Sequence, residues 1–142
     1  MTQTFLYIHV LSAVLMGFYL VLPLLAFKIS AQLEVQGKKS QLELLFSLNR
    51  FGQLAVVIAF LSGGYLVSQA EYPTLWWILA ILLLLAIAAV GGILGSNMRK
   101  VIRDSDASEI LKRMGKIRSL SVFACLLYFL MITLMLFPNV FI

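Results

Sequence analysis

Four long apolar segments, separated by short polar ones, dominate the sequence. The first is uninterrupted from Phe5 to Phe27, and the second runs from Leu54 to Val67. The third begins at Leu75, and the fourth becomes apolar near Ser119 and stops before Pro138. About twenty apolar residues, each rising about 1.5 Å in a helix, cross a bilayer core of about 30 Å. The pattern therefore predicts an all-α, polytopic membrane protein built as an antiparallel bundle of four transmembrane helices.

Polar residues between the segments indicate where the helices end. Pro23 predicts a kink inside the first helix, and Gly37 suits its carboxyl-terminal cap. Ser40 and Glu43 have the S-x-x-E spacing of a capping box, in which both side chains satisfy free amides at a helix start. Asp106 begins the same spacing before the fourth helix. We expect one domain, 1–142, with helices over about 3–36, 40–69, 75–103 and 107–137.

The basic residues indicate the orientation of the bundle. All eleven Lys and Arg residues lie between the first and second segments or between the third and fourth. Positively charged connections stay on the cytoplasmic side of a membrane. We therefore expect both termini outside, in a multi-pass protein of the bacterial cytoplasmic (inner) membrane. Topology accounts for these charges, although they could also bind a protein partner or an anionic lipid.

Composition narrows the chemistry. Of the 142 residues, 62% are apolar and 12% are charged, whereas soluble domains carry about 25% charged residues. Cys125 is the only cysteine, which excludes a disulfide within one chain. The sequence has no nucleotide-binding loop, metal-ligand cluster or nucleic-acid motif, and its apolar segments contain no Asp or Glu. We therefore assign no reaction to the chain. We expect it to contact a lipid bilayer and not to bind nucleic acid.

His9 is the only histidine, and it lies about one turn inside the outer end of the first helix. It shares a helical face with Ala13, Met16, Gly17 and Leu20, and the small residues of this face allow another helix to approach. His9 should therefore point into the bundle. An imidazole there can ligate a metal or haem iron, relay a proton, or hydrogen-bond a neighbouring helix.

Two methionines near the outer end of the fourth helix, Met131 and Met135, are candidate partners for His9. Thioether and imidazole both suit haem iron, although methionine in a membrane helix is more commonly a packing residue. The candidate cofactor site is therefore His9 with Met131 or Met135, and the candidate cofactor is haem. His9 is a candidate metal ligand only if the metal is haem iron, and otherwise we expect no cofactor.

Five glycines are expected at contacts between helices, because a missing side chain lets two backbones approach closely. Gly91 and Gly95 form a G-x-x-x-G pair, which is typical of packing within a bundle or of a dimer face. The full set is Gly17, Gly63, Gly64, Gly91 and Gly95.

The run from His9 to Pro23, HVLSAVLMGFYLVLP, resembles the first helix of a group of bacterial four-helix membrane proteins. The group includes the HemJ-type protoporphyrinogen oxidases, the CopD copper-resistance family and integral membrane proteins without assigned activity. The segments 50–52, 62–64 and 76–77 resemble the last of these most closely. The resemblance implies that His9 corresponds to the first-helix histidine that binds haem in the HemJ-type proteins.

Two functions are compatible with these features. The first is a haem- or redox-associated membrane protein with a site near His9 in the outer half of the bundle. The second is a non-catalytic accessory or assembly subunit that docks its glycine-containing helices against a larger membrane complex. The shortage of reactive groups favours this alternative, and a homo-oligomer is also compatible with the sequence.

Overall fold

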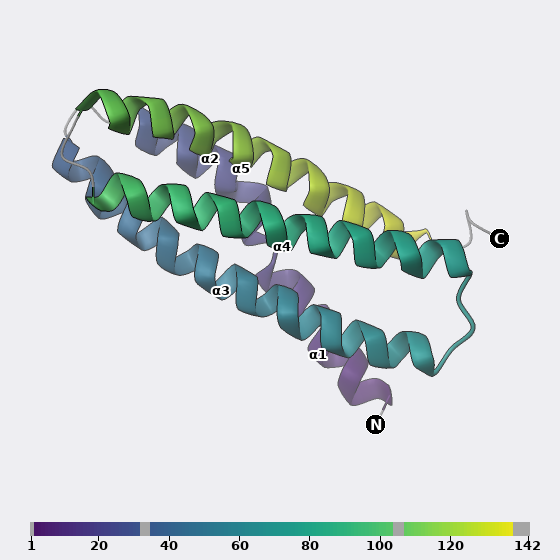
Figure 1. Cartoon of the computed structure of the whole chain (residues 1–142). Coiled ribbons are helices and arrows are strands. Elements are labelled where there is room, and N and C mark those ends of the chain that lie inside the picture. Colours follow the sequence, from purple (N-terminus) through teal and green to yellow (C-terminus); the bar gives the residue numbers. More distant parts are fainter. Residues whose placement is uncertain (1, 32–34, 104–106, 138–142) are drawn as a thin grey trace.

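The computed structural model describes residues 2–31, 35–103 and 107–137, and nearly all of these are helical (Figure 1). Four segments are long and apolar enough to cross a membrane, as the sequence predicts. The first of these segments contains two helices, and each of the others is one helix. The helices are α1 (Thr2–Leu15), α2 (Phe18–Ser30), α3 (Val35–Ser68), α4 (Thr74–Arg103) and α5 (Ala107–Leu136).

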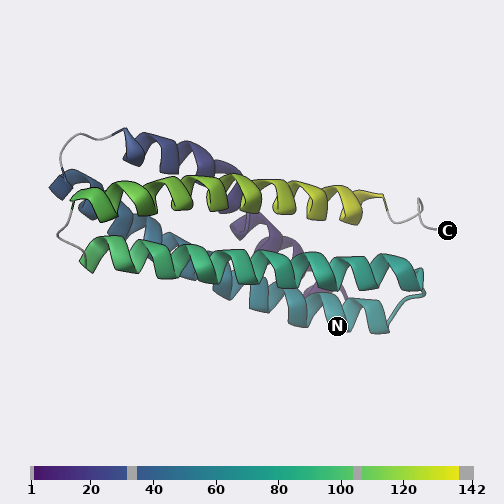
Figure 2. The ribbon, with the colours of Figure 1, turned by 45° about the horizontal axis from the view of Figure 1, so that its top comes forward.

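The four spans form an antiparallel bundle, which confirms the predicted all-α fold (Figures 1 and 2). α3 packs against α4, and α4 packs against α5. The first span crosses from one side of the bundle to the other, because α1 packs on α3 whereas α2 packs mainly on α5. The end of α2, the start of α3, the end of α4 and the start of α5 lie together at one end of the bundle (Figure 1). We call it the basic end, because all eleven Lys and Arg residues lie in the halves of the spans nearest to it.

The break between α1 and α2 falls at Met16 and Gly17, where the sequence pattern predicts no interruption. Pro23 lies inside α2. Around the break the backbone tightens, with Gly17 N–H donating to the Val14 carbonyl at 2.9 Å and Tyr19 N–H donating to the Met16 carbonyl at 2.9 Å. A Cβ on Gly17 would lie 2.8 Å from the Val14 carbonyl oxygen. Glycine therefore permits the tight turn that redirects the span from α3 to α5.

The beginning of α3 also differs from the sequence expectation. Gly37, Ser40 and Glu43 lie inside α3, which begins at Val35, so they form neither a helix cap nor a capping box. The buried positions of this part of α3 recur at helical spacing, at Lys38, Leu42, Leu45 and Asn49. This packed face extends almost to the start of the helix, so tertiary contact overrides the local capping signal. Asp106 lies outside the described residues, and α5 begins at Ala107.

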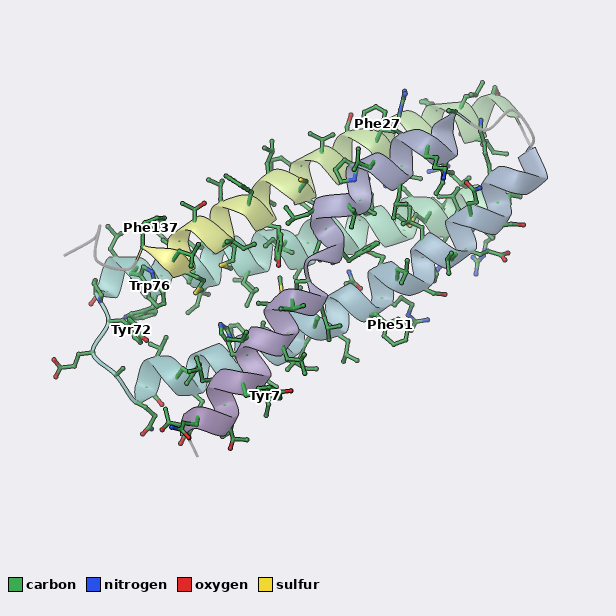
Figure 3. All side chains as sticks on the ribbon, turned by 180° about the vertical axis from the view of Figure 1, so that it is seen from behind. Tyr7, Phe27, Phe51, Tyr72, Trp76 and Phe137 are labelled. Carbon is green, nitrogen blue, oxygen red and sulfur yellow. The ribbon has the colours of Figure 1, made fainter. Side chains whose placement is uncertain are left out.

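The side chains sort into a packed centre and an apolar exterior. The fully buried ones include Tyr19, Leu22, Ile87, Leu94, Met98 and Ile117. Large apolar side chains also cover the outside, among them Tyr7, Phe27, Phe51 and Phe137, which point away from the bundle (Figure 3). Soluble monomers seldom expose contiguous apolar surfaces on this scale, whereas a membrane helix presents them to lipid. The exterior therefore fits a lipid bilayer.

The break at Gly17 leads to a stability prediction. We expect Gly17→Ala to destabilise the protein by about 1–3 kcal/mol, because the added methyl group would meet a backbone carbonyl that cannot rotate away. Gly115→Ala is the matched control, since a Cβ at Gly115 meets nothing within 4 Å. Thermal unfolding of both variants in the same detergent, followed by circular dichroism, would measure the difference. Equal midpoints for the two variants would contradict this account of the turn.

Candidate functional site

His9 lies on α1 and faces α3, as its position on the small-residue face predicts. Its Nδ1 is 3.1 Å from the Ala59 carbonyl oxygen and 3.1 Å from Ser62 Oγ. Ser62 Oγ donates its own proton to the Ile58 carbonyl at 2.7 Å, so both atoms facing Nδ1 are acceptors. Nδ1 must therefore carry a proton, and in the neutral imidazole Nε2 then presents a lone pair.

Gly63 provides the surface on which the imidazole rests. A Cβ at Gly63 would lie 2.9 Å from His9 Cε1 and 3.3 Å from Nδ1. Its neighbour Gly64 is exposed, and a Cβ there would meet nothing within 4 Å. Gly64 is therefore not a packing residue within this chain, because one further residue turns the helix by about 100° and away from α1.

The candidate partners of His9, Met131 and Met135, lie on α5. Met131 is buried, and Met135 is partly buried against the core. The Tyr128 hydroxyl of α5 donates a hydrogen bond of 2.5 Å to the Ala13 carbonyl of α1. His9 is one turn outward from Ala13, and Met131 is about one turn outward from Tyr128. The two residues therefore lie at a similar depth on antiparallel spans, although His9 Nδ1 faces α3.

Metal-binding chemistry is sparse elsewhere. In the stretches 2–31, 35–103 and 107–137, no three His, Cys, Asp or Glu side chains gather closely enough to hold a metal ion. Cys125 is a free, partly buried thiol on α5, and its Sγ is 3.8 Å from the Leu20 carbonyl oxygen. A metal held by His9 would therefore need most of its ligands from a prosthetic group, as the iron of haem has.

A second polar site lies between α3 and α4 towards the basic end. The sequence did not lead us to expect it. It is a cavity of about 340 Å³ that opens widely to the surface of the bundle. On each helix the residues that line the cavity recur with the spacing i, i+3, i+4, i+7, which places them on one helical face. This spacing is the one sequence signal that could have revealed the site. The lining residues are Phe46, Asn49, Arg50 and Gln53 on α3, and Gly92, Gly95, Ser96 and Arg99 on α4.

Glycines bring α3 and α4 together beside this cavity. Both Gly91 and Gly95 are buried. A Cβ at Gly91 would lie 2.9 Å from the Tyr19 hydroxyl, and one at Gly95 would lie 3.0 Å from Asn49 Nδ2. The G-x-x-x-G pair therefore contacts neighbouring helices of the same chain, and this face is not free to form a dimer.

The fold and these two sites define a small multi-pass membrane protein with few polar groups inside its spans. Comparison of the chain with known protein families, with curated proteins and with solved structures finds no match. The resemblance of the first helix to the HemJ- and CopD-type proteins therefore stays a prediction.

The contact between His9 and Gly63 is testable with two adjacent glycines. We expect Gly63→Ala to displace the imidazole and to weaken its bonds to α3, at a cost of about 1 kcal/mol. Gly64→Ala should be neutral or stabilise the helix by up to about 1 kcal/mol. Nitrogen NMR of the labelled imidazole would show one neutral form, protonated at Nδ1, in the wild type and in Gly64→Ala. An unchanged spectrum in Gly63→Ala would show that the glycine does not position the ring.

Proposed function

We propose that this membrane protein is haem- or redox-associated and that His9 Nε2 is its ligand-binding atom. The observation that supports the proposal is the bonding of the other ring nitrogen, Nδ1, to the Ala59 carbonyl and Ser62. Histidines that bind metals usually donate their second N–H to a carbonyl or carboxylate, which fixes the tautomer and aims the remaining lone pair. Among the described residues, Nε2 has no hydrogen-bond partner.

The donor chemistry of the neighbouring span is compatible with haem. His9 would supply an imidazole nitrogen to the iron, and Met131 or Met135 would supply a thioether from a similar depth, a pair of ligands known from cytochromes. Bound haem would contribute one-electron chemistry. The contribution of the chain is to hold the imidazole: Ala59 and Ser62 fix its Nδ1–H, and Gly63 leaves room for the ring.

A non-catalytic accessory role is the second candidate, and the surroundings of Gly64 favour it. Gly64 is exposed, and a Cβ there would meet nothing within 4 Å among the described residues. A small residue at such a position would allow a helix of another protein to approach. On this alternative, His9 serves only to join α1 to α3. Docking through Gly91 and Gly95, which the sequence suggests, is excluded because both glycines are buried within the chain.

Absorption spectroscopy separates the two candidates. We expect gently solubilised wild-type protein, from cells well supplied with haem, to show a Soret band that responds to reduction and is lost in His9→Ala. Ser62→Ala is the matched control, because it removes one acceptor but leaves His9 and the Ala59 carbonyl. This variant should keep the band, with haem affinity reduced by no more than about tenfold.

A featureless wild-type spectrum would rule out the haem proposal. In that case the accessory role predicts that His9→Ala still assembles with a larger complex, whereas Gly64→Leu does not. A band that survives in His9→Ala would show that haem binds without His9.

A further inference from the structure

We infer that the cavity between α3 and α4 binds the headgroup of an anionic phospholipid whose polar group carries hydroxyls, as in phosphatidylglycerol. The inference is independent of His9, because the cavity lies on residues 46–53 of α3 whereas His9 contacts Ala59 and Ser62, further along the same helix. It depends on four observations: charge, an unsatisfied buried acceptor, membrane depth and the apolar surfaces on either side.

Two arginines place positive charge at the cavity, and no acidic side chain of the described residues pairs with either of them. Arg50 and Arg99 come from different helices, and their guanidinium carbons lie 6.0 Å and 5.6 Å from the centre of the Phe46 ring. Both side chains are exposed. Guanidinium groups bind phosphate oxygens well, because their N–H groups form parallel hydrogen bonds.

A buried side chain in the cavity lacks a hydrogen-bond donor. Asn49 is 1% exposed. Its Nδ2 donates to the Gly91 carbonyl at 3.0 Å, but its buried Oδ1 accepts no hydrogen bond. Buried polar atoms are nearly always satisfied. Because Asn49 is one of the residues that line the cavity, a ligand held there could supply the missing donor. The ionised phosphodiester of a lipid has no proton to donate, whereas the hydroxyls of a glycerol headgroup do.

The cavity lies at the depth of lipid headgroups. The apolar run of α4 from Leu75 to Leu94 contains twenty residues, which span about 30 Å and match the hydrocarbon core. Ser96 and Arg99 lie two and five residues beyond the end of this run. The polar residues of α3 that face them, such as Gln53, likewise precede its apolar run.

Apolar side chains beside the cavity favour a lipid over a free anion. Phe51 and Leu54 follow cavity residues on α3, and Ile93 follows Gly92 on α4. These three side chains are 69%, 56% and 52% exposed. Acyl chains attached to a headgroup in the cavity would lie along such surfaces, whereas inorganic phosphate would gain nothing from them.

Native mass spectrometry of the full chain in detergent tests this inference. We expect phosphatidylglycerol to bind at least tenfold more tightly than phosphatidylcholine. Replacing both arginines, Arg50→Gln with Arg99→Gln, should reduce phosphatidylglycerol binding at least tenfold. The matched control is Lys112→Gln with Lys116→Gln, which removes the same charge from exposed positions near the basic end and should change binding less than twofold. Equal losses in the two double variants would show diffuse charge attraction and would overturn the site.

A second variant, which fills the cavity, tests the site even if the double arginine variant does not fold. Gly92→Leu keeps both charges, and its Cβ would lie at an ordinary 3.7 Å from Gln53 Nε2. It should also lose phosphatidylglycerol binding at least tenfold. Normal binding in this variant would place the lipid elsewhere on the protein.

Two further ligands separate the headgroup from its alternatives. Phosphatidylmethanol has the same charge but no headgroup hydroxyl, so it should bind several-fold more weakly than phosphatidylglycerol because Asn49 Oδ1 stays unsatisfied. Equal binding would overturn the role of Asn49. Millimolar inorganic phosphate should not displace the lipid, and displacement would identify a site for free anions instead.

Discussion

A lipid bilayer offers no hydrogen bonds to a polar group, and this constraint accounts for how the four spans are joined. A polar side chain within them is therefore stabilised when it finds a partner on the protein. In the described residues, several side chains reach the backbone of another span, among them His9 to Ala59, Asn49 to Gly91, Trp76 to Leu134 and Tyr128 to Ala13. These hydrogen bonds connect α1 with α3, α3 with α4, α4 with α5, and α5 with α1. They therefore form a closed ring around the bundle.

The ring matters because apolar burial distinguishes poorly between helix neighbours in a membrane. Lipid tails are as apolar as leucine, so helices associate through close packing and hydrogen bonds, the latter worth about 0.6–2 kcal/mol each. A side chain that bonds to one particular carbonyl fixes the rotation and the register of its helix. Packing completes the join where glycine permits it, as at Gly63 beneath His9 and Gly95 beside Asn49. The bundle is therefore specified by a few polar contacts within a largely uniform apolar interior.

This division explains which features could be predicted from the sequence. Hydropathy alone predicts the four spans, because each must match the thickness of the membrane. The inward direction of His9 follows from its small-residue face. Its acceptor, the Ala59 carbonyl, has no side-chain signature, so the sequence could not reveal it.

Features that depend on two helices were harder to predict. Pro23 is a stronger local signal than Gly17, yet the break falls at Gly17, where the first span leaves α3 for α5. The cavity required the relative register of α3 and α4, since Arg50 and Arg99 are far apart in the chain and meet only around Phe46. Periodicity within one helix cannot supply that register.

In this ring of hydrogen bonds, the Asn49 side chain is only partly satisfied. Ser62, which contacts His9, is itself satisfied by the Ile58 carbonyl, whereas Asn49 donates to Gly91 but its own oxygen accepts nothing. An unsatisfied buried acceptor costs about 1–3 kcal/mol. A lipid hydroxyl at Asn49 would remove that cost and hold the amide in the orientation that bonds to Gly91. The link between α3 and α4 would then depend on the membrane as well as on the chain, and α3 also carries the Ala59 carbonyl that orients His9.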